Sequence, residues 1–154
     1  QDSLGELDLI WRPGVVLGDV TVYVRGYYGQ LNGSTPPNQL GPILRGNPAT
    51  DDGVACLTNR TSGTTATQGL FDVAAGVASD LSVQALSPVP GNNSEYTYVL
   101  SARGSTVSCS ITPIGGSAVV RNATTARPAG SVGIYMFNAR HRVRSITVFA
   151  HGVP

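Results

Sequence analysis

Two carboxylates near the start of the chain, Glu6 and Asp8, have a spacing that could support acid–base chemistry. They stand at alternate positions of "GELDLIW", residues 5–11, and alternate side chains of a β-strand point to the same face. A retaining glycosidase needs two carboxyl groups about 5 Å apart, one of which donates a proton. The residue three positions after Asp8 is Trp11, which cannot donate a proton to a glycosidic oxygen. We therefore predict no catalytic residues and interpret Glu6 and Asp8 as solvent-facing charges on an edge strand, where they discourage edge-to-edge pairing.

Other catalytic and metal-binding patterns are also weak. The only histidines are His141 and His151, and no His-x-x-x-His or Cys-x-x-Cys spacing exists, so we expect no zinc site. There is no Gly-x-Ser-x-Gly elbow, although a Ser-His-Asp triad with members distant in sequence stays open. Asp51 and Asp52 could hold Ca²⁺ in a loop, but adjacent acids between Gly and Pro are more typical of a plain turn. We predict neither a metal nor a cofactor.

Aromatic and planar cationic side chains at strand ends are the best candidates for binding, because sugar recognition uses flat aromatic faces and planar polar groups. We expect Tyr27 and Tyr28 to open a long loop after a strand, and Arg140 and His141 to occupy the last turn. The predicted ligand- or partner-binding residues are Trp11, Tyr27, Tyr28, Arg140 and His141. In the alternative interpretation the two tyrosines cover the core, and the site then lies on the strand face carrying Thr21, Tyr23 and Arg25.

The elements that must position these residues are strands. Nineteen Gly, ten Pro and only 12% charged residues favour strands and turns over helices, and 41% hydrophobic residues suffice for a core. In the ambiguous stretch 69–86, Gly76 disfavours a helix and favours two strands joined by a turn. We expect a loop over residues 29–42 and a single domain over residues 1–154. The expected strands cover residues 6–12, 19–25, 43–45, 53–58, 70–74, 80–86, 95–103, 105–112, 117–121, 131–138 and 142–150.

Four stretches, taken in order, resemble the concanavalin A-like (laminin G or glucanase-type) jelly roll. They are "GPILRG", "DGVACLTN", "YTYVLSARGSTVSCSI" and "AGSVGIYMFNARHRVRSITVFA", the last being similar to the closing strand pair of that superfamily. The resemblance implies an all-β antiparallel sandwich. "GELDLIW" also resembles the Glu-x-Asp-x-x-Glu strand of glycosidases with this fold, but it lacks the third acid and lies at the N-terminal end. The superfamily contains lectins, adhesion modules, glycosidases and virion proteins, so the fold alone does not give the function.

The cysteines and the glycosylation motifs indicate whether the protein is exported from the cell. Cys56 and Cys109 each fall inside an expected strand, where they form either a disulfide, contributing about 4 kcal/mol, or two buried thiols. Four Asn-x-Ser/Thr motifs, which are candidate glycosylation sites, point modestly to an exported protein. These motifs begin at Asn32, Asn59, Asn92 and Asn122.

Taken together, these features predict a non-catalytic, surface-displayed recognition or adhesion module, most plausibly carbohydrate-binding. The alternative is a structural subunit of an assembly, such as a virion decoration or tail protein or an extracellular filament; a glycoside hydrolase comes third. The expected partners are a glycan or neighbouring protein subunits, with a homo-oligomer left open. Net charge +1 gives no indication of a nucleic-acid partner, and no apolar run approaches the roughly 20 residues of a membrane span. The expected location is extracellular or on a virion surface.

Overall fold

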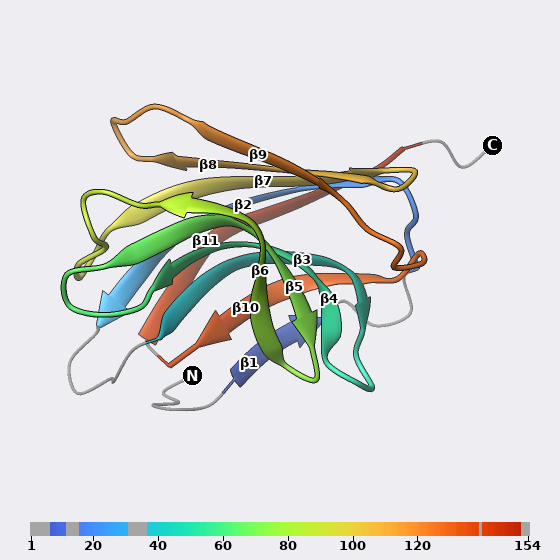
Figure 1. Ribbon diagram of the computed structural model, residues 1–154, viewed down its shortest axis with the longest axis horizontal. Helices are drawn as coiled ribbons and strands as arrows, with labels where there is room; N and C mark the ends of the chain where they lie inside the picture. Colours follow the sequence, from blue (N-terminus) through green and yellow to red (C-terminus); the bar gives the residue numbers. More distant parts are fainter. Residues whose placement is uncertain (1–6, 12–15, 31–36, 139, 152–154) are drawn as a thin grey trace.

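Two antiparallel β-sheets packed face to face make up the described part of the chain (Figure 1). The structure is a computed structural model, and it describes residues 7–11, 16–30, 37–138 and 140–151. The six-stranded sheet contains, in spatial order, β1 (Leu7–Trp11), β10 (Ser131–Phe137), β3 (Asn38–Asn47), β4 (Asp52–Arg60), β5 (Ala66–Ala74) and β6 (Val77–Ala85). The five-stranded sheet contains β11 (Arg140–Ala150), β2 (Val20–Gln30), β7 (Glu95–Arg103), β8 (Thr106–Pro113) and β9 (Val119–Thr124).

This architecture confirms the predicted all-β antiparallel sandwich of jelly-roll type. The chain changes sheet between β1 and β2, between β2 and β3, and again at β6–β7, β9–β10 and β10–β11. Every pairing between named strands is antiparallel. Among the described residues there is no helix, and hence none with the length and apolar character that a membrane crossing requires.

Period-2 alternation of apolar residues builds the core between the sheets. Val20, Val22 and Val24 of β2 are buried, and the strand register sets them opposite Ala102, Leu100 and Tyr98. From the other sheet, Leu40, Leu44, Val54, Leu70 and Ile134 complete the same cluster. Each fully buried Val or Leu contributes about 1.5–3 kcal/mol relative to an exposed position.

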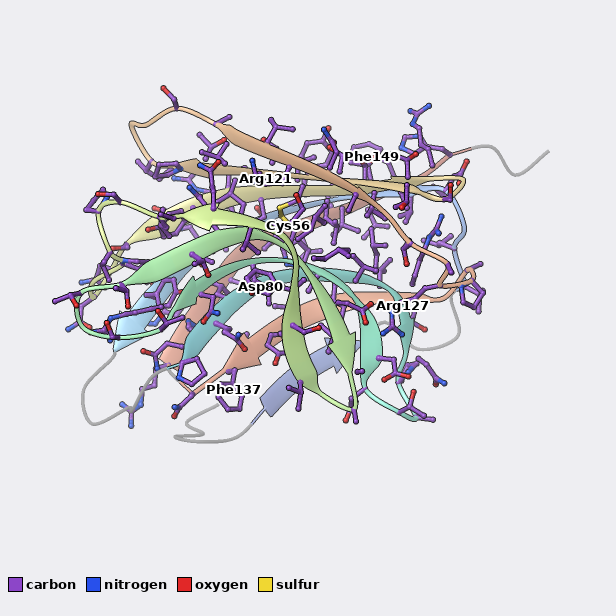
Figure 2. All side chains as sticks on the ribbon, in the orientation of Figure 1. Cys56, Asp80, Arg121, Arg127, Phe137 and Phe149 are labelled. Atoms are coloured by element: carbon purple, nitrogen blue, oxygen red, sulfur yellow. A yellow bond between two sulfur atoms is a disulfide. The ribbon has the colours of Figure 1, made fainter. Side chains whose placement is uncertain are left out.

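A disulfide joins the two sheets through the centre of this core. Cys56 of β4 and Cys109 of β8 are both fully buried and are bonded, with sulfur atoms 2.04 Å apart (Figure 2). Of the two alternatives left open by the sequence, the disulfide is therefore the correct one. The bond encloses a sequence separation of 53 residues, and it fixes strands that belong to different layers.

Three hydroxyl groups form a hydrogen-bonded chain inside the apolar core. The Tyr28 hydroxyl lies 2.9 Å from both the carbonyl oxygen and the Oγ1 of Thr58, and that Oγ1 lies 2.7 Å from the Tyr98 hydroxyl. Burial raises the pKa of both Tyr28 and Tyr98, because the core solvates a charged phenolate poorly. Both tyrosines therefore remain neutral and serve as hydrogen-bonding core residues.

Several predicted elements are confirmed and others are corrected. The β7–β8 hairpin follows the prediction closely, and residues 69–86 form two strands with a turn at Ala75 and Gly76, where φ is 49° and 76°. The predicted loop over 29–42 is wrong in part, because β2 continues to Gln30 and β3 begins at Asn38. The predicted closing pair is also wrong: β10 and β11 are consecutive in sequence but belong to different sheets.

Candidate functional site

Tyr27 and Tyr28 lie inside β2, and not after its end as the sequence predicted. Because neighbouring strand residues point to opposite faces, the two tyrosines have different environments. Tyr28 is fully buried, and its ring packs edge-on against Tyr96, with ring centroids 6.3 Å apart. A side chain in this position cannot reach a ligand, so the prediction that Tyr28 binds a partner is corrected: it is a core residue. Tyr27 is half-buried on the outer face of the sheet.

Arg140 and His141 do not form a turn; they begin β11 and pair with Gln30 and Tyr28 of β2. The His141 ring packs edge-on against Tyr28, with centroids 4.9 Å apart. Arg140 is exposed. The expectation of a turn at these residues is thus corrected to an extended edge strand, in which His141 packs onto a core tyrosine.

Trp11 lies in the other sheet. It ends β1, which is an edge strand paired with β10, and it stands opposite Gly133. Asp8 is on the same edge strand, opposite Met136, while Glu6 lies outside the described residues. The structure confirms the edge position of this strand. It places Trp11 and Tyr27 in different sheets and Tyr28 in the core, so the five predicted residues do not lie together on one sheet face.

Among the aromatic side chains that the structure describes, the most accessible lie on the outer face of the five-stranded sheet. Tyr23 of β2 is 43% exposed and Phe149 of β11 is 51% exposed. Their rings meet edge to face, with centroids 5.6 Å apart and planes at 84°, and Figure 2 shows Phe149 on this outer layer. Edge-to-face contact orients both rings and leaves aromatic surface open to solvent. This is the face that the alternative interpretation of the sequence singled out through Thr21, Tyr23 and Arg25.

Short hydroxyl side chains continue this face across the sheet. The register places Thr97 opposite Arg25 and Ser101 opposite Thr21, and further Ser and Thr residues follow on β8. The members at alternate positions of β7 and β8 are Thr97, Ser101, Thr106, Ser108, Ser110 and Thr112. The result is a sheet face on which hydroxyl groups surround one aromatic pair, with Val99 directly opposite Tyr23.

A cluster of charged groups stands at one end of the same face, and we call it the basic cluster: Arg25, Tyr27, Glu95, Arg142 and Arg144. The Nε atoms of Arg25 and Arg144 lie 2.6 and 2.9 Å from the same carboxylate oxygen, Oε1 of Glu95. The guanidinium carbons of Arg142 and Arg144 lie 6.0 and 5.2 Å from the centre of the Tyr27 ring. Arg142 also donates a hydrogen bond to the Tyr27 hydroxyl, at 3.3 Å. Sequence reasoning missed Arg25, Glu95 and Arg144 as a group, because only strand pairing brings residues so distant in sequence together.

The outer face of the six-stranded sheet carries a second set of buried apolar side chains. The sheet curls strongly (Figure 1), and a second apolar cluster occupies its concave side. Its fully buried or nearly buried members are Ile43, Ala55, Leu57, Phe71, Val73 and Tyr135. The Tyr135 hydroxyl of β10 donates to the carbonyl oxygen of Gly76, in the β5–β6 turn, at 2.8 Å. Burial raises the pKa of Tyr135 to about 12, so this bond persists at neutral pH. These six side chains therefore offer no exposed apolar or aromatic surface of their own to a ligand.

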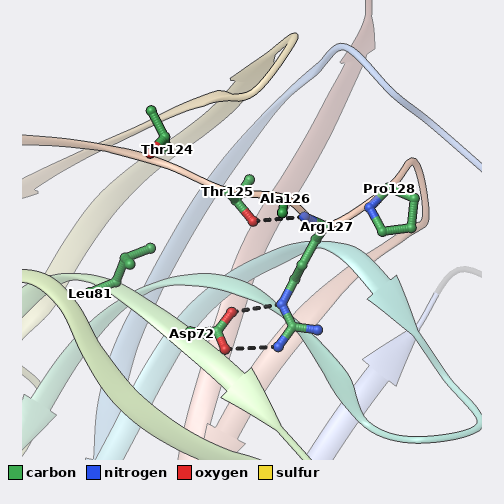
Figure 3. Close-up of a pocket in the computed structure, with 7 residues that line it drawn as sticks. All are labelled: Asp72, Leu81, Thr124, Thr125, Ala126, Arg127 and Pro128. Atoms are coloured by element: carbon green, nitrogen blue, oxygen red, sulfur yellow. Dashed lines mark hydrogen bonds and ion pairs between the residues drawn. The ribbon is translucent and has the colours of Figure 1, made fainter.

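A third candidate, at one end of the sandwich, surrounds Arg127 (Figure 3). A cavity of about 500 Å³ is lined by Asp72, Leu81, Thr124, Thr125, Ala126, Arg127 and Pro128. Arg127 donates to both carboxylate oxygens of Asp72, at 2.6 and 2.9 Å, and to the carbonyl oxygen of Val73, at 2.7 Å. The hydrogen bond to Asp72 raises the pKa of Arg127. Because the guanidinium is already engaged, we interpret this cluster as a structural tie between the β9–β10 connection and β5.

Neither a metal site nor Ca²⁺ binding gains support from the described residues. These residues include no group of three or more His, Cys, Asp or Glu side chains able to hold a metal ion. Asp52 instead accepts hydrogen bonds from the backbone N–H of Ala75 and from the Thr50 hydroxyl, both at 2.8 Å. The Ala75 bond is the main cause of the lowered pKa of Asp52. This carboxylate therefore ties the β3–β4 turn to the β5–β6 turn.

The four glycosylation motifs have different environments. Asn92 and Asn122 are exposed, so a glycan could be attached without disturbing the fold. Asn59 lies at the end of β4, as the sequence indicates, but it is only 8% exposed. Asn122 lies in the middle of β9, which corrects the expectation that all four motifs fall in loops or at strand ends. Asn32 lies outside the described residues.

Comparison with known proteins supports the fold. No protein-family profile matches the sequence, and no curated protein is recognisably related to it. Among solved structures, the chain is similar to a carbohydrate-binding module, CBM66 from Bacillus subtilis, with a TM-score of 0.71 and 16% identity over 96% of this chain and 83% of that one. It is also similar to Xenopus laevis galectin-Ib, with a TM-score of 0.56 and 9% identity over 94% and 100% of the two chains.

A tailspike protein 2 from a bacteriophage of Escherichia coli O157:H7 has a similar domain, with a TM-score of 0.65 and 12% identity over 95% of this chain and 22% of that one. All these structures are sandwiches of the jelly-roll, concanavalin A-like kind, so the predicted resemblance is confirmed at the level of the fold. The sequence identities are too low to carry function from these proteins to this chain.

Proposed function

We propose that the chain is a non-catalytic, surface-displayed recognition module that binds carbohydrate on the outer face of its five-stranded sheet. The observation that carries the proposal is the exposed aromatic pair, Tyr23 and Phe149, on a sheet face that also carries many Ser and Thr side chains. A sugar ring offers C–H groups to an aromatic face and hydroxyl groups to neighbouring polar side chains. The pair and the surrounding hydroxyls supply both kinds of contact in one plane.

The fold and the disulfide are consistent with this proposal. Solved structures with a similar fold include a carbohydrate-binding module and a galectin, although their low identity to this chain makes this support indirect. The buried Cys56–Cys109 disulfide favours an oxidising compartment, because cytosolic proteins rarely retain such bonds. We therefore propose an extracellular or virion-surface location.

A structural subunit of an assembly is the second candidate. Tyr23, Phe149, Ile146 and Val120 are exposed apolar residues in the same sheet, and exposed apolar surface often marks protein–protein contacts. A similar domain in a phage tailspike protein is consistent with this alternative. Self-association at micromolar concentration, measured by light scattering, together with no binding on a glycan array would favour the structural subunit over the recognition module.

Alanine at Tyr23 or at Phe149 should weaken glycan binding while the fold is kept. Loss of an anchoring aromatic costs about 1–2 kcal/mol, which is roughly a 5- to 30-fold increase in Kd. The measurement is Kd for the strongest hit of a glycan array, with circular dichroism to follow thermal unfolding. Val77→Ala is the control, because Val77 is exposed on β6 of the other sheet. Equal affinities of Tyr23→Ala, Phe149→Ala and Val77→Ala would exclude this face as the binding site.

The chain should not hydrolyse β-glucans. Asp8 is followed at the third position by Trp11, which cannot donate a proton, and Asp8 lies on an edge strand. Incubation with laminarin or lichenan should release no reducing sugar above a heat-denatured control. If the wild type releases reducing sugar and Glu6→Gln does not, this prediction is wrong and the chain is a glycoside hydrolase.

A further inference from the structure

Charge is distributed very unevenly between the two halves of the sandwich, although the whole chain carries only +1. The strands of the five-stranded sheet contain one acidic residue, Glu95. The same strands contain six arginines: Arg25, Arg103, Arg121, Arg140, Arg142 and Arg144. The rest of the chain holds four arginines and eight acids, so it is net negative. The net charge of the whole chain is therefore close to zero, although the five-stranded sheet is strongly basic.

Within that sheet, positive charge converges at the basic cluster. Three guanidinium groups, from Arg25, Arg142 and Arg144, gather around a single carboxylate and the Tyr27 ring. Glu95 neutralises one of the three, and an excess of two positive charges remains. The Arg25 and Arg144 side chains are 49% and 57% exposed, so this excess faces solvent.

The free hydrogen-bond donors of the cluster are placed for a second acidic group. Arg25 and Arg144 both reach Glu95 through Nε. Within the described part of the chain, their terminal nitrogens have no hydrogen-bond acceptor. Guanidinium groups bind carboxylate or sulfate oxygens in pairs, and such charge-assisted bonds are about twice as strong as neutral ones. Glu95 and the Tyr27 ring hold the two side chains in place, which reduces the conformational entropy lost when an anion binds.

From these contacts we propose that the natural ligand of this face is an acidic polysaccharide, whose carboxylate or sulfate groups bind Arg25, Arg142 and Arg144. This inference rests on the proposed carbohydrate-binding function and specifies the chemical class of its ligand. Tyr23 and Tyr27 lie four residues apart on the same side of β2, which is about 13 Å along a strand. An oligosaccharide of a few units spans that length, with one sugar ring on the Tyr23–Phe149 pair and an acidic group at the basic cluster.

The test is isothermal titration calorimetry of the whole chain against four defined probes. These are polygalacturonate, which carries carboxylates; heparin, which carries sulfates; dextran, which is neutral; and a single-stranded DNA oligonucleotide. We expect saturable binding to polygalacturonate or to heparin, and the stronger of the two identifies the acidic group. No comparable binding to dextran or DNA is expected. Affinity should fall as salt is added, because exposed charges are screened.

Two variants and a matched control locate the site. Arg25→Gln with Arg144→Gln should weaken binding of the acidic probe at least tenfold. Arg103→Gln should not, because Arg103 is an exposed arginine at the far end of β7 from Glu95. Glu95→Gln should have the opposite effect: the amide oxygen can still accept from Arg25 and Arg144 and hold them in place, while the competing negative charge is lost, so the acidic probe should bind more tightly. Thermal unfolding of each variant verifies that the sandwich is folded.

The alternative results separate this inference from the proposed function. If a neutral glycan binds and the Arg25 and Arg144 substitutions leave its affinity unchanged, the acidic ligand is wrong while carbohydrate binding stands. Equal affinity for DNA and for the acidic polysaccharide would also overturn the inference, since the cluster would then bind any polyanion. If no glycan of either kind binds, the proposed function fails together with the inference.

Discussion

Reduction of the Cys56–Cys109 disulfide should lower the free energy of unfolding by about 4 kcal/mol. The bond encloses a sequence separation of 53 residues, so it removes many conformations from the unfolded chain, and it fastens β4 to β8 across the core. For a chain of this size the corresponding fall in melting temperature is roughly 10 °C. The measurement is thermal unfolding by circular dichroism with and without a reductant that does not absorb in the far ultraviolet.

The control for this experiment is a Cys56→Ala, Cys109→Ala double variant. Its melting temperature should be low and unaffected by reductant, which separates loss of the bond from any other action of the reductant. A wild-type chain that titrates two free thiols after denaturation without reduction would contradict the prediction.

The strands whose sequences have clear alternation could be predicted in place. Tyr96, Tyr98, Leu100 and Ala102 share a face in β7 and are all buried, as the sequence indicated. Here each local signal agrees with the packing: apolar residues at every second position, and Gly104 with φ 52° in the turn after the strand. In this hairpin, the tertiary packing requires the same strand and turn that the local sequence favours.

The errors fall where Gly or Pro serves packing inside a strand. The strand was predicted to end at Arg25, immediately before Gly26, whereas β2 continues to Gln30. In the structure, a Cβ at Gly26 would lie 3.3 Å from the carbonyl oxygen of Arg142 and 3.4 Å from Leu40. The loop over residues 29–42 was predicted from its Asn-Gly and Pro-Pro pairs, and it wrongly included Gly41 and Pro42 of β3. A Cβ at Gly41 would lie 1.9 Å from the carbonyl oxygen of Cys56, so glycine allows two strands to approach closely. One sequence cannot distinguish such a packing glycine from a turn glycine.

The candidate site was harder to predict than the fold, because its parts meet only through strand pairing. Consecutive antiparallel strands usually pair, so β10 and β11 were expected to be neighbours. Instead the chain turns at Asn138, where φ is 55°, and the Asn38 side chain donates to the Asn138 carbonyl oxygen at 2.6 Å. As a result β11 pairs with β2, which itself pairs with β7, and these two pairings bring Arg144 close to Glu95 and Tyr27. A signal was nonetheless present in the sequence: after Asp80, Glu95 is the only acid among six arginines.

Tyr28→Ala should destabilise the fold by about 3–5 kcal/mol, as expected when a buried aromatic is truncated. The Tyr28 ring fills the core between β2 and β4, and it contacts both Tyr96 and His141 edge-on. Its hydroxyl also forms hydrogen bonds with the carbonyl oxygen and the Oγ1 of Thr58, which a smaller side chain could not reach. Chemical denaturation with urea measures the loss, and Tyr28→Phe, which keeps the ring, should recover most of it because a single hydrogen bond contributes about 1 kcal/mol.

Tyr27→Ala is the matched comparison, since it changes the adjacent residue of the same type on the opposite face of β2. Tyr27 is only half-buried and contacts two exposed arginines, so its loss should cost less than about 1 kcal/mol of stability. Its effect should appear in binding to acidic glycans, because Arg142 and Arg144 lose the ring that supports them. A Tyr27→Ala variant as unstable as Tyr28→Ala would mean that both tyrosines are core residues. Equal stability of Tyr28→Ala and the wild type would show that Tyr28 is not held in the core at all, and the assignment of the binding face to the other side of β2 would fall with it.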